Sequence, residues 1–278
     1  MKKINRRSFL AAAGLTAAAL ALTACGGSAS STASSTASSA ASSEAASTSA
    51  AAELTTVEAG KLTMATNAAF PPYEMTTDAG EFEGIDIDTA KAIAEKLGLE
   101  LQIDDMDFDA ALLSVQQGKA DIVMAGVTVT DERKAVMDFS DSYATGIQSI
   151  IVPEGSDITS PDDLAGKKIG TQRGTTGYIY CSDDFGDDAV VAYDDGLTAV
   201  QALNNGQVDA VVIDNAPAQE FVAANPGLVI LDTSYAEEDY AIGLAKGSAL
   251  EDAVNAALEE LKADGTLQSF VDKFITAE

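Results

Sequence analysis

Two hydrophobic patterns take turns along the chain beyond residue 57. Residues 61–66 and 99–103 alternate between apolar and polar side chains, as a half-buried strand does. Between them, apolar residues from 85 to 97 recur at helical spacing, and Gly98 follows as a helix stop. The succession of strand and helix continues to the end of the chain, which predicts an α/β architecture with largely parallel sheets.

One local pattern occurs twice. A predicted helix over 110–115 leads into an apolar strand over 121–125, and QQGKADIVMAG (116–126) aligns without a gap with NNGQVDAVVID (204–214). Two interpretations fit: generic helix–turn–strand chemistry, or two related α/β lobes. Ligands of open parallel sheets bind beyond the carboxyl ends of the strands. Two lobes that face each other would therefore bring Gly126 and Asp214 together across a cleft.

The first 24 residues have the layout of an export signal. A positive segment, MKKINRRSFL, precedes an apolar one, AAAGLTAAALALTA, that is too short and wrongly flanked for a stable transmembrane span. The signal ends in Leu22-Thr23-Ala24-Cys25-Gly26, which resembles the lipobox of bacterial lipoproteins. Cys25 is then lipidated, and residues 25–56 form a Ser/Ala-rich flexible linker. Arg6-Arg7 resembles a twin-arginine motif, so the export route stays open.

Acidic residues dominate the remainder of the chain. Four of the 16 Lys and Arg lie in the first 24 positions, which hold no acid, so 12 basic residues face 44 acidic ones, a net charge of −32. This balance argues against nucleic-acid binding. Without histidine or CxxC, no zinc site, no histidine-based triad and no cofactor is expected. With Cys25 lipidated, Cys181 has no disulfide partner.

Only two arginines follow the signal, Arg133 and Arg173. Thr130 is a plausible N-cap, so Arg133 falls at the third position of a helix, against the preference of the helix dipole. That cost favours a dedicated role, such as bidentate binding of a carboxylate. The alternative is a surface arginine paired with a nearby acid.

Four further features can be read in two ways. Gly174-Thr175-Thr176-Gly177 follows a strand-like stretch and either opens a helix that offers N–H groups to an anion or forms a plain turn. Asp214 lies at the end of a buried strand, where it either binds an ammonium group or caps the N-terminus of the next helix. Phe70 and Phe108 look like loop aromatics that are either cleft walls or ordinary core.

Together these residues carry a resemblance to the family 3 extracellular solute-binding proteins, the receptors of amino acid ABC importers. It covers about residues 58–278. The motifs that carry it are ATNAAFPPYEM (65–75), MDFDAALLSVQQGKADIVMAGVTVTDERKAVMDFSDSY (106–143), GTTG (174–177), VDAVVIDNAP (208–217) and EDYAIGLAKGS (238–248). The resemblance implies a two-lobed type II periplasmic-binding-protein fold with two hinge strands, near 143–147 and 237–241, and a ligand in the interlobe cleft. Lobe 1 then comprises 57–145 and 241–278, and lobe 2 comprises 146–240.

The resemblance also implies a role for each site residue. Arg133 would hold the α-carboxylate, helped by N–H groups at Thr128 and Thr176, and the GTTG loop adds Thr175. Asp214 would hold the ammonium, with the Gly126 carbonyl and the Thr128 hydroxyl. Phe70 and Phe108 would form the aromatic walls over the aliphatic part of the ligand, and Asn67 would lie near its side-chain end. Asn67 departs from relatives for cationic or amide side chains, which often carry Asp there.

The function implied is the binding component of an amino acid ABC importer: a monomer without enzymatic activity. Its partners would be a small amino acid, a permease–ATPase complex and, through the lipid on Cys25, the extracytoplasmic side of the cell membrane. No acid is expected near the side-chain end, which favours a neutral, polar L-amino acid and disfavours a cationic one. An acidic ligand stays open if Arg173 turns inward.

Two other functions remain open from the sequence. Some proteins on this fold are similar to dehydratases of small carboxylic acids, for which Glu74 is the nearest candidate general acid, unless it is a surface acid. A sensor that binds an amino acid without feeding a transporter is the second.

Overall fold

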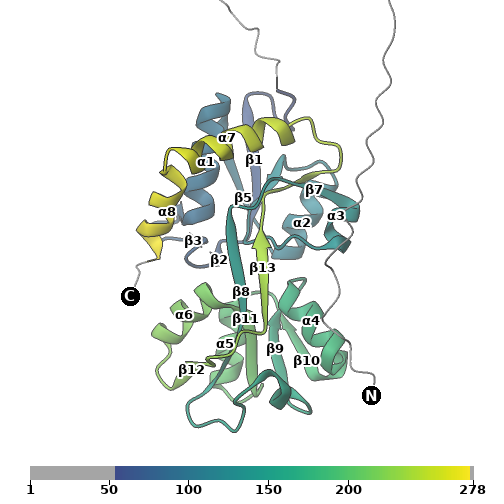
Figure 1. Ribbon diagram of the computed structural model, residues 1–278, viewed down its shortest axis with the longest axis vertical. Coiled ribbons are helices and arrows are strands. Elements are labelled where there is room, and N and C mark those ends of the chain that lie inside the picture. The colour runs from purple at the N-terminus through teal and green to yellow at the C-terminus, as the bar shows by residue number, and fades with distance from the viewer. Residues whose placement is uncertain (1–53, 276–278) are drawn as a thin grey trace, which may run out of the picture. The chain divides into compact units, whose positions relative to one another are not determined.

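The computed structural model describes residues 54–275. The predicted signal peptide, Cys25 and nearly all of the predicted linker therefore lie outside the described residues. Within this range the chain forms two lobes, each built on its own large sheet, and two long strands run between the lobes (Figure 1). Leu54, at the end of the predicted linker, already packs against the hydrophobic core. No helix among the described residues combines the length and apolar character that crossing a membrane requires.

The first lobe is centred on a five-stranded sheet. In spatial order its strands are β5 (Glu100–Asp105), β1 (Lys61–Thr66), β6 (Ile122–Val123), β14 (Gly243–Ala245) and β7 (Met137–Phe139). A small second sheet consists of β2 (Ala69–Phe70), β3 (Glu74–Thr76) and β4 (Phe82–Glu83). β1 pairs in parallel with β5 and β6, whereas β14 runs antiparallel to both of its neighbours.

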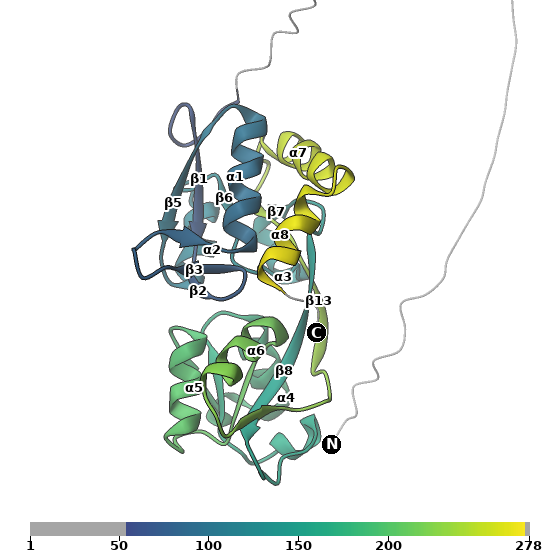
Figure 2. The same ribbon diagram turned by 90° about the vertical axis from the view of Figure 1, so that its left-hand side faces the viewer.

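Five helices belong to this lobe: α1 (Ile85–Leu97), α2 (Phe108–Gln116), α3 (Asp131–Val136), α7 (Glu251–Ala263) and α8 (Thr266–Phe274). Of these, α1, α7 and α8 pack against one another on one side of the lobe (Figure 2). The predicted division of residues 249–274 into two helices is confirmed, and Gly265 takes a left-handed conformation at the break.

The first helix forms where the apolar periodicity predicts it. Its buried face includes Ile85, Ile87 and Ile93, and Gly98 ends it in a left-handed conformation, with its N–H bonded to carbonyls of the last turn. Asp86 and Asp88 lie in the first turn, where the helix dipole favours negative charge.

The strand predicted over 121–125 is shorter in the structure, where β6 covers only Ile122–Val123. The preceding Asp121 accepts N–H groups from Val57 and Thr63 at 2.7 and 2.8 Å. Beyond the strand the chain turns away into the loop at Gly126. The hydrogen bonds of Asp121 before the strand and the turn at Gly126 after it therefore restrict the pairing of β6 with β1 to a short stretch.

The second lobe carries a six-stranded sheet. Its strands are β10 (Val190–Tyr193), β9 (Ile169–Gln172), β11 (Ala210–Asp214), β8 (Ala144–Pro153), β12 (Leu228–Ile230) and β13 (Ala236–Tyr240), the last of which pairs with β8. Its helices are α4 (Thr176–Phe185), α5 (Gly196–Asn204) and α6 (Asn215–Ala224), with 3-10 turns at Pro161–Leu164 and Asp187–Ala189. Cys181 is a free, buried thiol in the core of this lobe.

The repeated sequence pattern adopts the same local structure in both lobes. Gly118 and Gly206 follow α2 and α5 at φ of 66° and 67°. The next shared residue, Asp209, accepts the N–H of Lys168 at 2.7 Å, as Asp121 accepts backbone N–H groups in the first lobe. The strands that follow also pair in the same way, because β6 runs parallel to β1 and β11 runs parallel to β9.

The lobes are joined by β8 and β13, which pair antiparallel from Ala236 opposite Gln148 to Tyr240 opposite Ala144. These strands lie where the sequence predicts the two crossings. The sheets are consequently less parallel than the strand–helix alternation predicts, since a chain that crosses and returns must place strands in opposite directions.

Tyr240 and Gly146 meet on this ribbon. A β-carbon on Gly146 would lie 2.4–2.5 Å from ring carbons of Tyr240 and 2.6 Å from its hydroxyl oxygen, and Tyr240 is fully buried. The ring therefore occupies the space that a side chain at 146 would need.

We expect Gly146→Ala to lower the free energy of unfolding by about 1–3 kcal/mol, because overpacking forces a buried ring to move. Chemical denaturation monitored by circular dichroism measures the change. The matched control is Thr145→Ala on the exposed neighbouring position. Equal stability of the two variants would contradict the steric argument.

Candidate functional site

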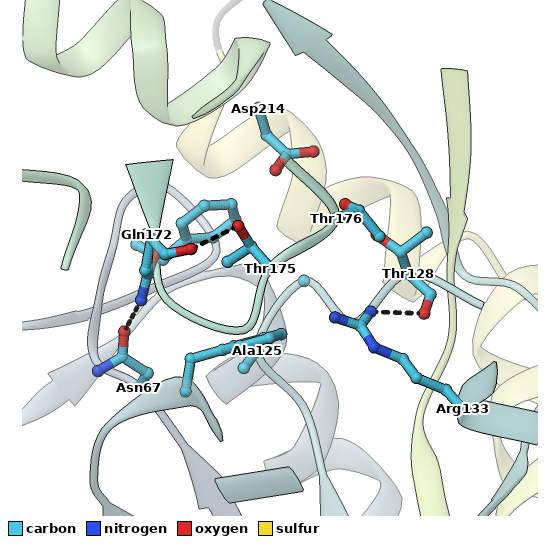
Figure 3. A pocket seen from close by; sticks show the side chains of 11 residues that line it. Asn67, Ala125, Thr128, Arg133, Gln172, Thr175, Thr176 and Asp214 are labelled. Atoms are coloured by element: carbon cyan, nitrogen blue, oxygen red, sulfur yellow. Dashed lines mark hydrogen bonds between the residues drawn. The ribbon is translucent and has the colours of Figure 1, made fainter. Parts of the chain in front are cut away.

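A cavity lies between the two lobes, with about 300 Å³ of empty space including its open mouth. Eleven residues line it: Asn67, Phe70, Phe108, Ala125, Gly126, Thr128, Arg133, Gln172, Thr175, Thr176 and Asp214. They include all nine cleft residues expected from the sequence. Figure 3 shows Arg133, Asp214 and the Asn67–Gln172 pair at three corners of this space. Within residues 54–275, no group of His, Cys, Asp or Glu side chains could hold a metal ion.

The start of α3 positions Arg133. Thr130 caps the helix, as its position predicts, by accepting the Arg133 N–H at 3.2 Å. The guanidinium lies 5.4 Å from the ring centroid of Phe108 and donates to the Thr128 carbonyl at 2.7 Å and the Gly174 carbonyl at 3.1 Å. These two carbonyls come from different lobes, so the arginine contacts both walls of the cavity.

This guanidinium is buried without an ion pair. Arg133 is 8% exposed, and no carboxylate of residues 54–275 lies within 4 Å of it. Burial lowers the pKa of Arg133, while the field of Glu238 is the largest effect in the opposite direction. A surface arginine paired with a nearby acid is therefore the wrong interpretation.

Arg173 does not share this environment. It lies on the surface with its side chain half exposed, 3.4 Å from the carboxylate of Asp194. The inward turn that would favour an acidic ligand is absent from this structure.

Asp214 ends β11 opposite Arg133 and is 7% exposed. Gln148 donates to its Oδ2 at 2.8 Å, and the Tyr240 hydroxyl donates to its Oδ1. Asp214 occupies the N-cap position of α6, as the alternative predicted, but its side chain makes no capping hydrogen bond. Burial raises the pKa of this carboxyl to about 7, against 3.8 for a free aspartate. No cationic side chain within the described part of the chain pairs with this carboxylate, which lines the cavity.

The GTTG segment opens a helix, and the plain-turn interpretation is wrong. Thr175 caps α4 by accepting the Tyr178 N–H at 3.3 Å, and Thr176 is the first helical residue. The N-terminus of a ten-residue helix therefore faces the cavity, with N–H groups and a partial positive charge that suit an anion.

Glu238, on β13, is not among the residues that line the cavity, but it bonds to two of them, and the sequence interpretation missed it. Its Oε2 accepts from the Thr128 hydroxyl at 3.0 Å, the Thr176 hydroxyl at 2.9 Å and Gln148 Nε2 at 3.1 Å. The sequence did hold a signal for it. Side chains two positions apart in a strand point to the same face, so Glu238 shares the buried face of Tyr240, where an acidic residue is unusual.

One end of the cavity carries amide groups. Gln172 Nε2 donates to Asn67 Oδ1 at 2.8 Å across the two lobes, and Asn67 Nδ2 donates to the Met106 carbonyl at 3.0 Å. Phe70 and Phe108 are both buried and line the cavity. Neither is a loop residue, because Phe70 lies in β2 and Phe108 is the first residue of α2. This end is polar and holds no acidic side chain in its lining.

Glu74 is neither a surface acid nor a cavity residue. It is fully buried on β3 and absent from the cavity lining. The sequence alone could not reveal this, because its surroundings come from α1 and from residues far along the chain.

Comparison with known proteins identifies the class. The model of the bacterial extracellular solute-binding proteins, family 3, matches residues 62–277. The chain belongs to this family, and the two-lobed fold with two hinge strands is the fold expected from the sequence.

Individual relatives differ in the ligands they are named for. The chain is 32% identical to the probable histidine-binding protein of Neisseria gonorrhoeae, covering 99% of this chain and 98% of that protein. It is 33% identical to the L-cystine-binding protein TcyJ of Escherichia coli strain K12, over 80% of this chain and 85% of that one. A solved structure of an ancestral arginine-binding protein bound to glutamine is 42% identical, with a TM-score of 0.75, over 78% of this chain and 99% of that one.

The raised pKa of Asp214 gives a stability prediction. A carboxyl whose pKa is raised by folding stabilises the protein fully below its unfolded pKa of 3.8, and this contribution is lost as pH rises through about 7. Relative to Asp214→Asn, the free energy of unfolding of the natural protein should fall by about 1.4 kcal/mol per pH unit within that window. Urea titrations at several pH values measure both proteins. A constant difference across the window would contradict the buried, unpaired state of Asp214.

Proposed function

We propose that this protein is the substrate-binding component of an amino acid ABC importer and that it captures an L-amino acid between its lobes. One observation carries the proposal: a buried guanidinium without a carboxylate partner faces a buried carboxylate without a cation across one cavity. An amino acid zwitterion carries the two missing charges on a single small molecule. The names of the relatives, which refer to histidine, cystine, arginine and glutamine, support an amino acid as the ligand.

The contacts support one orientation of the ligand. The α-carboxylate would meet Arg133 and the N–H groups of Thr128 and Thr176, and Thr175 fixes the start of α4. The ammonium would meet Asp214 and the Gly126 carbonyl. The Thr128 hydroxyl donates to Glu238, which leaves its oxygen able to accept from the ammonium.

The side-chain end supports a neutral, polar ligand. Asn67 and Gln172 offer amide hydrogen bonding there, between the aromatic walls Phe70 and Phe108. A lysine or arginine side chain would bury its charge beside these amides without an acidic partner, which costs several kcal/mol. Arg173 points away, so an acidic side chain lacks a cation as well.

Capture proceeds by closure of the lobes about β8 and β13. The proposed division assigns 57–145 and 241–278 to lobe 1 and 146–240 to lobe 2. Neither lobe alone offers both Arg133 and Asp214, so only a ligand that bridges them stabilises the closed arrangement. Binding without chemistry is supported by the lining, which lacks Glu74, the candidate general acid. The protein is therefore proposed to be no enzyme.

The remaining proposals rest on the sequence. Residues 1–24 would direct export, and lipid on Cys25 would hold the monomeric protein at the extracytoplasmic side of the cell membrane, next to its permease and ATPase. Genes for a permease and an ATPase beside this one would distinguish an importer component from a sensor.

Arg133→Ala should weaken amino acid binding by at least about 1.5–3 kcal/mol without unfolding the protein, because it removes a charge-assisted, bidentate contact. Arg133→Lys should recover little, since an ammonium cannot form the fork. Isothermal calorimetry measures both variants against Lys134→Ala, which removes an exposed cation from the same helix. Near-natural affinity of either Arg133 variant would refute the assigned role.

The ligand preference can be tested by a thermal-shift screen of the twenty amino acids and cystine. Competition calorimetry at one pH among glutamine, cystine, glutamate, lysine and arginine then ranks the candidates. A neutral, polar amino acid should bind most tightly, because a charged side chain would be buried at this end of the cavity without a partner of opposite charge. Tight and selective binding of lysine or arginine would show that the side-chain end is misassigned.

A further inference from the structure

Two acids lie directly behind the cavity wall, and no Lys or Arg of residues 54–275 forms an ion pair with either of them. Glu74 on β3 and Asp86, the second residue of α1, are both fully buried. The Asp86 N–H donates to the carbonyl of Tyr73, the residue before Glu74, at 2.9 Å, so the two carboxyl groups lie next to each other. Each is among the causes that shift the pKa of the other, and three of their four oxygens are buried without a donor from the described residues. The close approach of β3 and α1 depends on Gly84, where a β-carbon would lie 2.1 Å from the Tyr73 carbonyl oxygen. Because a carboxylate is only an acceptor, one member of this pair must carry a proton.

The surroundings decide which member carries it. Asp86 Oδ2 accepts the Gly126 N–H at 3.0 Å and the Tyr143 hydroxyl at 2.8 Å, and Asp86 lies in the first turn of a 13-residue helix. Both donors and the helix dipole favour its ionised form. No N–H or hydroxyl of the described residues reaches either oxygen of Glu74. The proton therefore belongs on Glu74.

The titration of the pair agrees with this assignment. Burial raises the pKa of both groups. That of Glu74 lies well above its ordinary value, whereas that of Asp86 rises only to about 6, because the Gly126 N–H and the Tyr143 hydroxyl lower it. The ionisable groups whose fields reach the pair are all acidic or phenolic: Tyr73, Tyr143, Asp105 and Asp214.

Asp86 connects three parts of the first lobe. Its helix provides the carboxylate, the Gly126 loop provides an N–H, and Tyr143 immediately precedes the crossing strand β8. Gly126 has a φ of 54°, and a β-carbon there would lie 2.8 Å from the Phe70 ring. Fixing its N–H fixes the peptide plane on one side of Gly126, and with it the direction of the loop.

We propose that Glu74 and Asp86 form a one-proton pair, protonated on Glu74 and ionised on Asp86, that positions the Gly126 loop for ligand and fastens it to the hinge. Asp86 acts as a positioning residue, and Glu74 keeps it ionised and oriented. The consequence for ligand rests on the proposed function, in which the Gly126 carbonyl accepts from the ammonium.

The protonation state can be tested without any ligand. In infrared spectra at pH 8, the natural protein should show the C=O band of a buried carboxylic acid, and Glu74→Gln should lose it. Asp214→Asn serves as the control and should retain the band. A band that persists in Glu74→Gln, or that is missing from the natural protein, would overturn the pair. This arm holds even if the proposed function fails.

The positioning role is tested by calorimetry with L-glutamine and L-arginine. Glu74→Leu removes the donor to Asp86 and Asp86→Asn removes the charged acceptor, so each should weaken binding about tenfold. Glu74→Gln restores an N–H donor and should recover most of what Glu74→Leu loses. Glu95→Gln, which removes an exposed carboxylate from the same helix, is the control.

Two results would contradict this role. Asp86→Asn binding as tightly as the control would show that the loop does not depend on the carboxylate. Glu74→Gln binding as weakly as Glu74→Leu would show that the donor is not what matters. Absence of binding to the natural protein with both amino acids would count against the proposed function, while the infrared result would still decide the pair.

Discussion

A positive charge buried between two lobes without an ion pair is the constraint on which the site depends. The carbonyls of Thr128 and Gly174 replace part of the water that Arg133 loses, but neutral dipoles do not cancel a full charge. The fields of Glu238 and Asp214 offset some of the remaining cost from a distance. Each of these groups sits on a different strand or loop, so the cleft is organised around compensating one side chain.

Glu238 also connects the two lobes to a crossing strand through hydrogen bonds. Its single Oε2 accepts from Thr128 of the first lobe, from Thr176 of the second and from Gln148 on a crossing strand. An opening motion separates the two threonines, and the carboxylate can follow only one of them. The strand that carries it, β13, is itself one of the two connections, so hinge bending and the loss of these hydrogen bonds are coupled.

Local sequence signals account for much of this molecule, and distant contacts account for what they miss. The periodicity of α1 and the cap at Thr130 involve residues close together in the chain, so the sequence alone predicts them. The nine expected cleft residues also line one cavity. The burial of Glu74 and the bonding of Glu238 depend on partners from other segments, with Thr128 lying 110 positions from Glu238. No periodicity encodes such partners, and the scarcity of arginine and the helix cap that singled out Arg133 carry no information about them.

The place of β14 in the first sheet has a consequence for the order in which the protein takes shape during synthesis. This strand, Gly243–Ala245, lies between β6 and β7, yet all of β8 to β13 separates it from them in the chain. A ribosome therefore produces every strand of the second sheet before the first sheet can be completed. Until then β6 and β7 lack their shared neighbour and expose unpaired edges. The second lobe can finish folding first, and the first lobe must wait for it.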